Sequence, residues 1–130
     1  MGSSFGAICN QCGEKFMVSQ GGGFCFHLLH CSQCGEEKAI GFDVLGEIHL
    51  RYLKGLSGPY SIATRDHDKE VQERYPGEPL SEAEYDLKVE EVAGKCKCGG
   101  RFSLDAPARC PKCKSDDYRE DPEVCELLYD

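Results

Sequence analysis

The stretch Ile8-Cys9-Asn10-Gln11-Cys12-Gly13 decides the interpretation of this sequence, because it places two thiols on either side of a tight turn. Cys31-Ser32-Gln33-Cys34-Gly35 repeats the pattern. In both stretches the glycine can adopt the positive φ that lets backbone amides point at sulfur. Two such pairs can converge on one metal ion at about 2.3 Å. We therefore predict a first metal site formed by Cys9, Cys12, Cys31 and Cys34.

A second set of four cysteines lies near the other end of the chain and departs from this pattern. Lys95-Cys96-Lys97-Cys98-Gly99 has one residue between its thiols instead of two. Cys110-Pro111-Lys112-Cys113 has the standard spacing, but Lys114 follows it where a glycine follows the earlier pairs. We predict that a second metal site is formed by Cys96, Cys98, Cys110 and Cys113.

The residues around each set predict short strands joined by turns. Residues 15–19 and 24–30 are expected to form a hairpin whose turn is the glycine-rich stretch 20–23. Residues 101–104 and 124–129 are expected to add strands to the second module. A segment of roughly 30 residues buries too little apolar surface to fold alone. Metal coordination must therefore supply the difference, and structural zinc contributes roughly 10 to 16 kcal/mol in such modules.

The sequence pattern of the middle of the chain, residues 41–95, predicts helices. The apolar positions of residues 42–56 recur at helical spacing, which leaves His49 on the solvent side. The charged residues 65–75 fit either a poorly buried helix or a mobile loop, and His67 within them is interpreted as an exposed residue.

The clearest helix signal lies between residues 81 and 94. Ser81 and Glu84 form a capping box, and Gly94 is placed to end the helix. The apolar stripe of this helix is expected to contain Tyr85, Val89 and Val92.

These patterns carry resemblances to known families. The first module is similar to the zinc ribbons, in which two cysteine pairs flank a hairpin. The Cys110-Pro111-Lys112-Cys113 pair resembles the rubredoxin-type ribbons and, less closely, the zinc lobe of accessory proteins that deliver nickel to hydrogenase. Those accessory proteins bind nickel through an amino-terminal Met-His motif, and this chain begins Met1-Gly2. Tandem ribbons around a helical centre also look like small uncharacterised bacterial zinc-ribbon proteins.

We accordingly predict a small α+β fold with two metal-stabilised β zinc ribbons joined by a helical segment. The expected units are an N-terminal ribbon (5–40), a helical region (41–95) and a C-terminal ribbon (95–130). Cys25, His27 and His30 lie near the first site, and His30 is the first substitute ligand to consider because it abuts Cys31. The sequence assigns no role to these three residues or to Cys125.

Charge and composition narrow the compartment and the partners. The 130 residues include ten cysteines and carry a formal net charge of −8. No signal-peptide pattern opens the chain, and no run approaches the roughly 18 apolar residues of a membrane span. We therefore expect a cytoplasmic protein without membrane contact, where thiol pairs favour metal over disulfides. The negative charge disfavours DNA and favours a protein partner.

The same features favour a non-enzymatic function. Four protein thiolates at each site leave no open coordination position for water or substrate, so we expect two structural zinc ions and no catalysis. The leading hypothesis is an interaction module for a protein partner. One alternative is RNA binding through the basic residues 95–114 around Phe102. The other is electron transfer by iron in rubredoxin-like sites.

Overall fold

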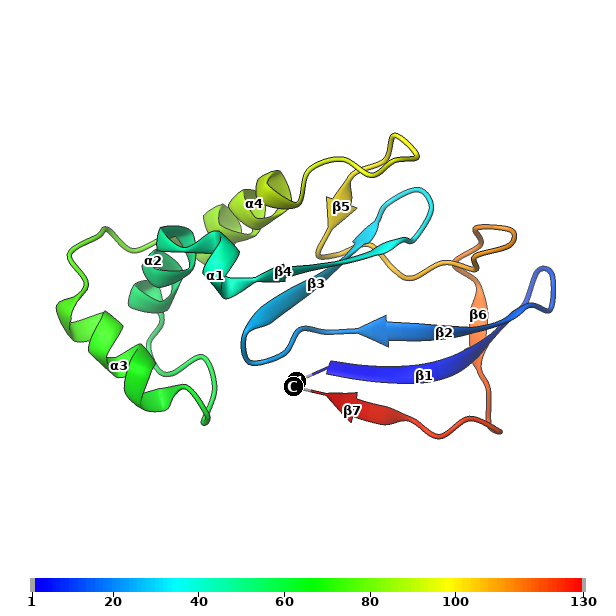
Figure 1. Ribbon diagram of the computed structural model, residues 1–130, viewed down its shortest axis with the longest axis horizontal. Coiled ribbons are helices and arrows are strands. Elements are labelled where there is room, and N and C mark those ends of the chain that lie inside the picture. The colour runs from blue at the N-terminus through cyan, green and yellow to red at the C-terminus, as the bar shows by residue number, and fades with distance from the viewer. Residues whose placement is uncertain (1, 130) are drawn as a thin grey trace.

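The computed structural model describes residues 2–129 and has the small α+β architecture expected from the sequence. Its four helices gather at one end, and the turns that follow β1 and β3 lie at the other (Figure 1). The described elements run in the order β1 (Gly2–Cys9), β2 (Lys15–Gln20), β3 (Phe26–Cys31), β4 (Glu37–Gly41), α1 (Phe42–Leu45), α2 (Glu47–Gly55), α3 (Arg65–Arg74), α4 (Glu82–Ala93), β5 (Phe102–Ser103), β6 (Tyr118–Glu120) and β7 (Leu127–Tyr129).

The strands form two antiparallel sheets, and each sheet combines both ends of the chain. In the first sheet, β1 pairs with β2 on one side and with both β6 and β7 on the other. In the second sheet, β3 pairs with β4 on one side and with β5 on the other. The cysteine pairs of the N-terminal half therefore close hairpins: β1 turns into β2 through Cys9 and Cys12, and β3 turns into β4 through Cys31 and Cys34.

The hairpin expected between residues 15–19 and 24–30 is wrong. Both segments are strands, but β2 pairs with β1, and β3 pairs with β4. The physical reason is that each Cys-x-x-Cys-Gly stretch is itself a tight turn. The N–H of Gly13 bonds the carbonyl of Cys9 at 2.9 Å, and the N–H of Gly35 bonds the carbonyl of Cys31 at 3.0 Å. Each turn thus folds its own two flanking strands together.

The C-terminal ribbon expected over residues 95–130 does not form a separate unit in the structure. This segment divides between the sheets, because β5 joins β3 whereas β6 and β7 join β1. Residues 5–40 divide as well, since β1 and β3 belong to different sheets. Long-range strand pairing, which local sequence does not reveal, decides this arrangement.

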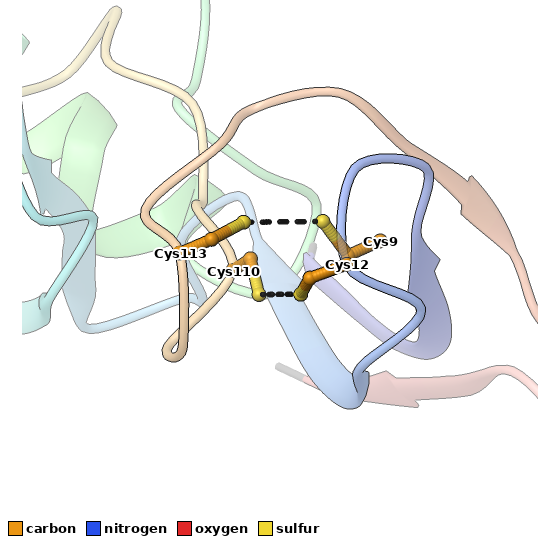
Figure 2. A group of neighbouring side chains, drawn as sticks. All are labelled: Cys9, Cys12, Cys110 and Cys113. Carbon is orange, nitrogen blue, oxygen red and sulfur yellow. Dashed lines mark hydrogen bonds between the residues drawn. The ribbon is translucent and has the colours of Figure 1, made fainter.

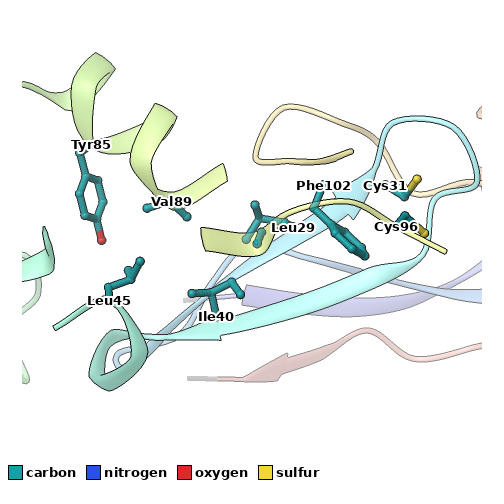
Figure 3. Close-up of a cluster of buried hydrophobic side chains, with 9 residues drawn as sticks. Leu29, Cys31, Ile40, Leu45, Tyr85, Val89, Cys96 and Phe102 are labelled. Carbon is teal, nitrogen blue, oxygen red and sulfur yellow. The ribbon is translucent and has the colours of Figure 1, made fainter. Parts of the chain in front are cut away.

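The main hydrophobic core lies between the second sheet and the helices. Leu29 and Ile40 from the strands meet Tyr85 and Val89 of α4, and Phe102 continues the cluster toward the cysteines (Figure 3). The full set of buried members is Leu29, Cys31, Ile40, Leu45, Tyr85, Val89, Ala93, Cys96 and Phe102. This core therefore ends on two cysteines that belong to different halves of the chain. A smaller cluster of Ala7, Val18 and Ala108 supports the first sheet.

The helices agree with the sequence in outline and differ in detail. The stripe over residues 42–56 is interrupted at Gly46, whose φ of 53° ends α1 before α2 begins. Residues 65–74 form the helix α3, which settles the choice between helix and loop. In α4, the Ser81 hydroxyl accepts the N–H of Glu84 at 3.2 Å, and Gly94 follows the last residue with a φ of 76°.

Two expectations about individual side chains in the helices are wrong. Val92 is exposed, and Ala93 takes the third place in the buried stripe of α4, because the stripe follows a spacing of four residues from Tyr85 through Val89. His49 is only 6% exposed instead of solvated. Its ring stacks on Phe42 with the centroids 3.8 Å apart, which places it inside an aromatic cluster.

Candidate metal centres

Eight of the ten cysteines gather in two groups of four, but not in the groups expected from their order. The first group joins Cys9 and Cys12, at the turn between β1 and β2, to Cys110 and Cys113 from the segment before β6. Its sulfur atoms all lie within 4.8 Å of one another. Figure 2 shows the two pairs facing each other, with Cys9 opposite Cys113 at 3.4 Å and Cys12 opposite Cys110 at 3.6 Å.

The second group joins the turn between β3 and β4 to the segment before β5. Its members are Cys31, Cys34, Cys96 and Cys98, again with all sulfur atoms within 4.8 Å. Cys31 faces Cys98 at 3.4 Å, and Cys34 faces Cys96 at 3.5 Å. The single residue between Cys96 and Cys98 is accommodated by a turn in which the N–H of Gly99 bonds the carbonyl of Cys96, and Gly99 has a φ of 94°.

The prediction that Cys31 and Cys34 complete the first site, and that Cys110 and Cys113 complete the second, is therefore wrong. The pairs are nested: the first pair along the chain meets the fourth, and the second meets the third. Spacing within a pair is a local property and identifies each pair correctly. The choice of partner depends on which distant strands pair, and β1 pairs with β6 while β3 pairs with β5.

Both groups have a donor set that fits a tetrahedral thiophilic metal ion. Four thiolates arranged tetrahedrally at about 2.3 Å from zinc lie roughly 3.8 Å from one another. The facing sulfur atoms, at 3.4 to 3.6 Å, are close to that separation and far beyond the roughly 2.05 Å of a disulfide bond. All ten cysteines are free thiols. Each group could therefore hold one metal ion.

Backbone amides stabilise a thiolate at one buried cysteine of each N-terminal turn. Burial raises the pKa of Cys9, but hydrogen bonds from backbone N–H groups, including that of Gln11 at 3.4 Å, outweigh burial and lower the pKa to about 7. Burial acts in the same direction on Cys31, and the N–H groups of Cys34 and Gln33 lower its pKa to about 6. Both turns thus favour the charged form that binds metals.

Cys12, the other cysteine of the turn between β1 and β2, holds its proton more tightly than Cys9. The pKa of Cys12 is raised to about 12: a backbone hydrogen bond to Glu14 lowers it, but burial and the sulfur atoms of Cys110, Cys113 and Cys9 raise it more. Four thiolates without a cation repel one another, so each group shares its protons unevenly. A bound cation removes this repulsion and allows all four sulfur atoms to ionise.

The other sulfur and imidazole groups named by the sequence stay outside both centres. Cys25 and Cys125 are exposed thiols that belong to neither group. His30 is buried in β3, and its Nε2 lies 3.9 Å from a carboxylate oxygen of Glu37 rather than against sulfur. His67 is largely exposed, with Nδ1 3.2 Å from the buried carboxylate of Asp68.

A hydrogen-bonded cluster in the helical end was missed by sequence reasoning. The Tyr85 hydroxyl lies 2.7 Å from Nε2 of His27 and 2.8 Å from Nδ1 of His49. Burial lowers the pKa of His27 to about 4, and burial together with the neighbouring His27 lowers that of His49 to about 4. The hydroxyl can donate to one neutral ring and accept from the other, so the three polar groups satisfy one another. His49 could have been identified only by its partner on a distant helix.

A groove runs between the two centres. It has a volume of about 620 Å³, and its lining includes Phe16 and Met17 of β2. Three cysteines of the second group also line it, together with four charged side chains: Cys34, Cys96, Cys98, Glu36, Lys97, Arg109 and Lys114. Gly35 and Arg109, which both line the groove, pack closely together: a β-carbon placed at Gly35 would lie 2.6 Å from the Arg109 backbone nitrogen.

With this geometry established, comparison with known proteins identifies a family. The family described as Domain of unknown function (DUF8255) matches residues 5–119, which include all eight clustered cysteines. This chain belongs to that family. Neither the curated proteins nor the solved structures contain a match to it. Among the described residues, no helix is long and apolar enough to cross a membrane.

Proposed function

We propose that this member of the family is a zinc-binding, non-enzymatic interaction module whose two metal ions stabilise the fold. The observation that carries the proposal is the donor set: each group supplies four cysteine sulfur atoms that converge on one point. A tetrahedral metal bound by four thiolates has no position left for a water nucleophile or a substrate. Zinc is the metal that closed four-thiolate sites of this kind commonly hold.

The position of the sites supports a structural function for the metals. Each metal would join a hairpin turn of the N-terminal half to a turn of the C-terminal half. The elements of the C-terminal half are short, because β5 has two residues and β6 has three. Such strands bury little surface of their own, so metal coordination supplies much of the free energy that holds them in place.

A protein partner is favoured by the surface of the helical segment. Residues 41–95 carry twelve acidic side chains against seven basic ones, which disfavours nucleic acid there. Large apolar side chains also protrude from this segment, and Val44, Ile62 and Leu87 are 63%, 91% and 63% exposed. Apolar anchors within an acidic surface suit a protein partner with a basic rim around an apolar patch.

Elemental analysis and a visible spectrum of protein purified without a metal-binding tag test the metal assignment. Two zinc ions per chain and no colour are the expected result. Iron with thiolate charge-transfer bands would instead favour electron transfer, the function that rubredoxin-like sites allow. Chemical crosslinking in cells, comparing wild type with Ile62→Asp and Leu87→Asp, tests the interaction surface. Crosslinked proteins that are unaffected by both substitutions would contradict this assignment.

RNA binding is the second candidate, and the cations beside the groove favour it. Lys97, Arg109 and Lys114 lie together there, and Phe102 is nearby in sequence but is buried in the core. The burial of Phe102 weakens the stacking part of the RNA hypothesis. Filter binding of a random RNA pool to wild type and to a Lys97→Glu, Arg109→Glu variant decides the matter. RNA binding by the wild type that falls with salt and is lost in the zinc-loaded variant would support RNA as the partner.

A further inference from the structure

The two metal centres differ in their access to the groove. Three of the four cysteines in the second group, Cys34, Cys96 and Cys98, line it. Of the first group, the described lining contains no cysteine, although Pro111 between Cys110 and Cys113 contributes to the wall. A molecule in this groove would therefore lie against three cysteines of the second centre.

The charges that line the groove suit a negatively charged ligand better than the charges on the rest of the protein do. A divalent metal with four thiolates carries a net charge of about −2, which repels an approaching anion. Lys97, Arg109 and Lys114 offset this charge together with that of Glu36, the acidic residue of the lining. The chain as a whole is strongly acidic, with a formal net charge of −8. The groove is thus the region where an anionic ligand could approach a metal centre without net repulsion.

We propose that the groove is the route by which an anionic thiol reaches the second centre, so that the metal held by Cys31, Cys34, Cys96 and Cys98 exchanges with a thiol carrier while the first metal stays bound. This inference rests on the metal binding in the proposed function. It does not depend on the identity of the protein partner.

The chemistry is a ligand exchange without oxidation or reduction. The incoming thiol forms a sulfur–metal bond, the bond from Cys98 to the metal breaks, and the proton of the incoming thiol passes to the Cys98 sulfur. Cys98 is exposed on the groove, which makes it the first ligand to be replaced. Cys96 also lines the groove, so it is the next ligand that the thiol can reach.

The test uses the full chain loaded with two zinc ions. The protein is incubated for increasing times with a limiting amount of meso-2,3-dimercaptosuccinate, an anionic dithiol. Iodoacetamide then labels the cysteines that are no longer bound to metal, and mass spectrometry shows which cysteines carry the label. Cys25 and Cys125 should be labelled at once because they are exposed and belong to neither group, so they serve as the internal reference. We expect label at the second group well before any label at Cys9, Cys12, Cys110 or Cys113.

A matched pair of variants isolates the groove. Lys97→Glu reverses a charge between two ligands of the second centre, inside the groove, whereas Lys112→Glu reverses one between two ligands of the first centre. Lys97→Glu should slow metal removal by dimercaptosuccinate roughly fivefold, with the effect shrinking at high salt. Removal by the uncharged dithiol 2,3-dimercaptopropanol should be unchanged in both variants, and Lys112→Glu should match the wild type with either reagent.

The same assay distinguishes the two sources of an anionic thiol. A synthetic acidic peptide with a Cys-x-x-Cys pair is compared with dimercaptosuccinate at equal thiol concentration. Faster metal removal by the peptide indicates a protein carrier, and faster removal by dimercaptosuccinate indicates a small-molecule carrier. Release of both metals at one rate, or earlier labelling of the first group, would overturn the inference while leaving two bound zinc ions in place. A chain that takes up fewer than two metal ions would overturn both the inference and the proposed function.

Discussion

At the scale of single residues, the two turn glycines Gly13 and Gly35 have the same backbone conformation but different packing around them. Both have a φ of 77°, which the tight turn between two cysteines requires. A β-carbon at Gly13 would meet nothing within 4 Å, whereas one at Gly35 would lie 2.5 Å from the β-carbon of Arg109. The conformation is therefore a property of the turn, and the close packing is a property of the groove.

Alanine substitution at these two positions separates the two effects. Gly13→Ala should cost about 1 to 2 kcal/mol of stability, because it places an L-residue in the left-handed region. Gly35→Ala should cost clearly more, since Arg109 must also move. Urea unfolding of the zinc-loaded variants measures both costs, and equal losses would contradict the close contact between Gly35 and Arg109.

The hydroxyl of Tyr85 is the second residue-scale feature with a measurable effect. Tyr85→Phe leaves the facing nitrogens of His27 and His49 without their partner, which should cost about 1 to 3 kcal/mol. Tyr52→Phe is the matched control, because the Tyr52 ring stacks on Tyr85 at 3.9 Å and its hydroxyl is not part of these two contacts. Thermal unfolding that shows the same loss in both variants would argue against the hydrogen-bonded cluster.

The two histidines also predict a pH dependence. Their pKa values of about 4 in the folded protein lie below the value of about 6.5 in an unfolded chain. The unfolded state therefore binds more protons between these limits, so stability should fall as the pH drops from about 6.5 toward 4. His49→Gln should make the free energy of unfolding less dependent on pH in this range. Stability measured at pH 5, 6 and 7 with zinc in excess provides the comparison, and an unchanged slope in the variant would count against the assignment.

At the scale of elements, helix α4 follows its sequence signals closely. Ser81 caps it and Gly94 ends it. Ser81→Ala should lower stability by about 1 kcal/mol, because the N–H of Glu84 loses its acceptor. Ser81→Asp restores an acceptor and serves as the control. Denaturant unfolding in which the aspartate variant is as unstable as the alanine variant would show that the cap is not the cause.

Other elements could not be predicted from their own residues. β1 contains Gly2, Gly6 and two serines, a composition poor in strand formers, yet it is the central strand of its sheet. Gly6 is required because β-carbon space there is filled by Val124 from the far end of the chain. Two of the three strands that pair with β1 lie more than 100 residues away, and local propensity carries no trace of them.

At the scale of the whole molecule, the sequence identifies the four cysteine pairs and the α+β class, but not which pairs combine. Sequential and nested pairing both satisfy four-thiolate coordination equally well. One signal was available: residues 9–13 and 31–35 are two copies of the same glycine-ended turn, which suggests two equivalent opening halves rather than one complete site. The two later pairs would then be their closing halves, as the structure has them.

Nested pairing predicts which substitutions share a phenotype. Cys12→Ser and Cys113→Ser lie 101 positions apart but remove ligands from the same group, so both should lose the same metal. Cys34→Ser should affect the other. Cadmium-113 spectra of the substituted proteins provide the measurement, because each intact four-thiolate site gives its own resonance. Loss of one common resonance from Cys12→Ser and Cys34→Ser would contradict the nested arrangement.

The nested order has a consequence for how the protein is made. As the chain leaves the ribosome, neither hairpin turn can complete its native set of four cysteines when it first emerges, since its partner turn has not yet been synthesised. The inner set is complete once Cys98 is exposed, and the outer set only when Cys113 follows. The residues of all four helices are therefore synthesised before either native set is complete. The donor set of the centre beside the groove is thus the first of the two to be fully synthesised.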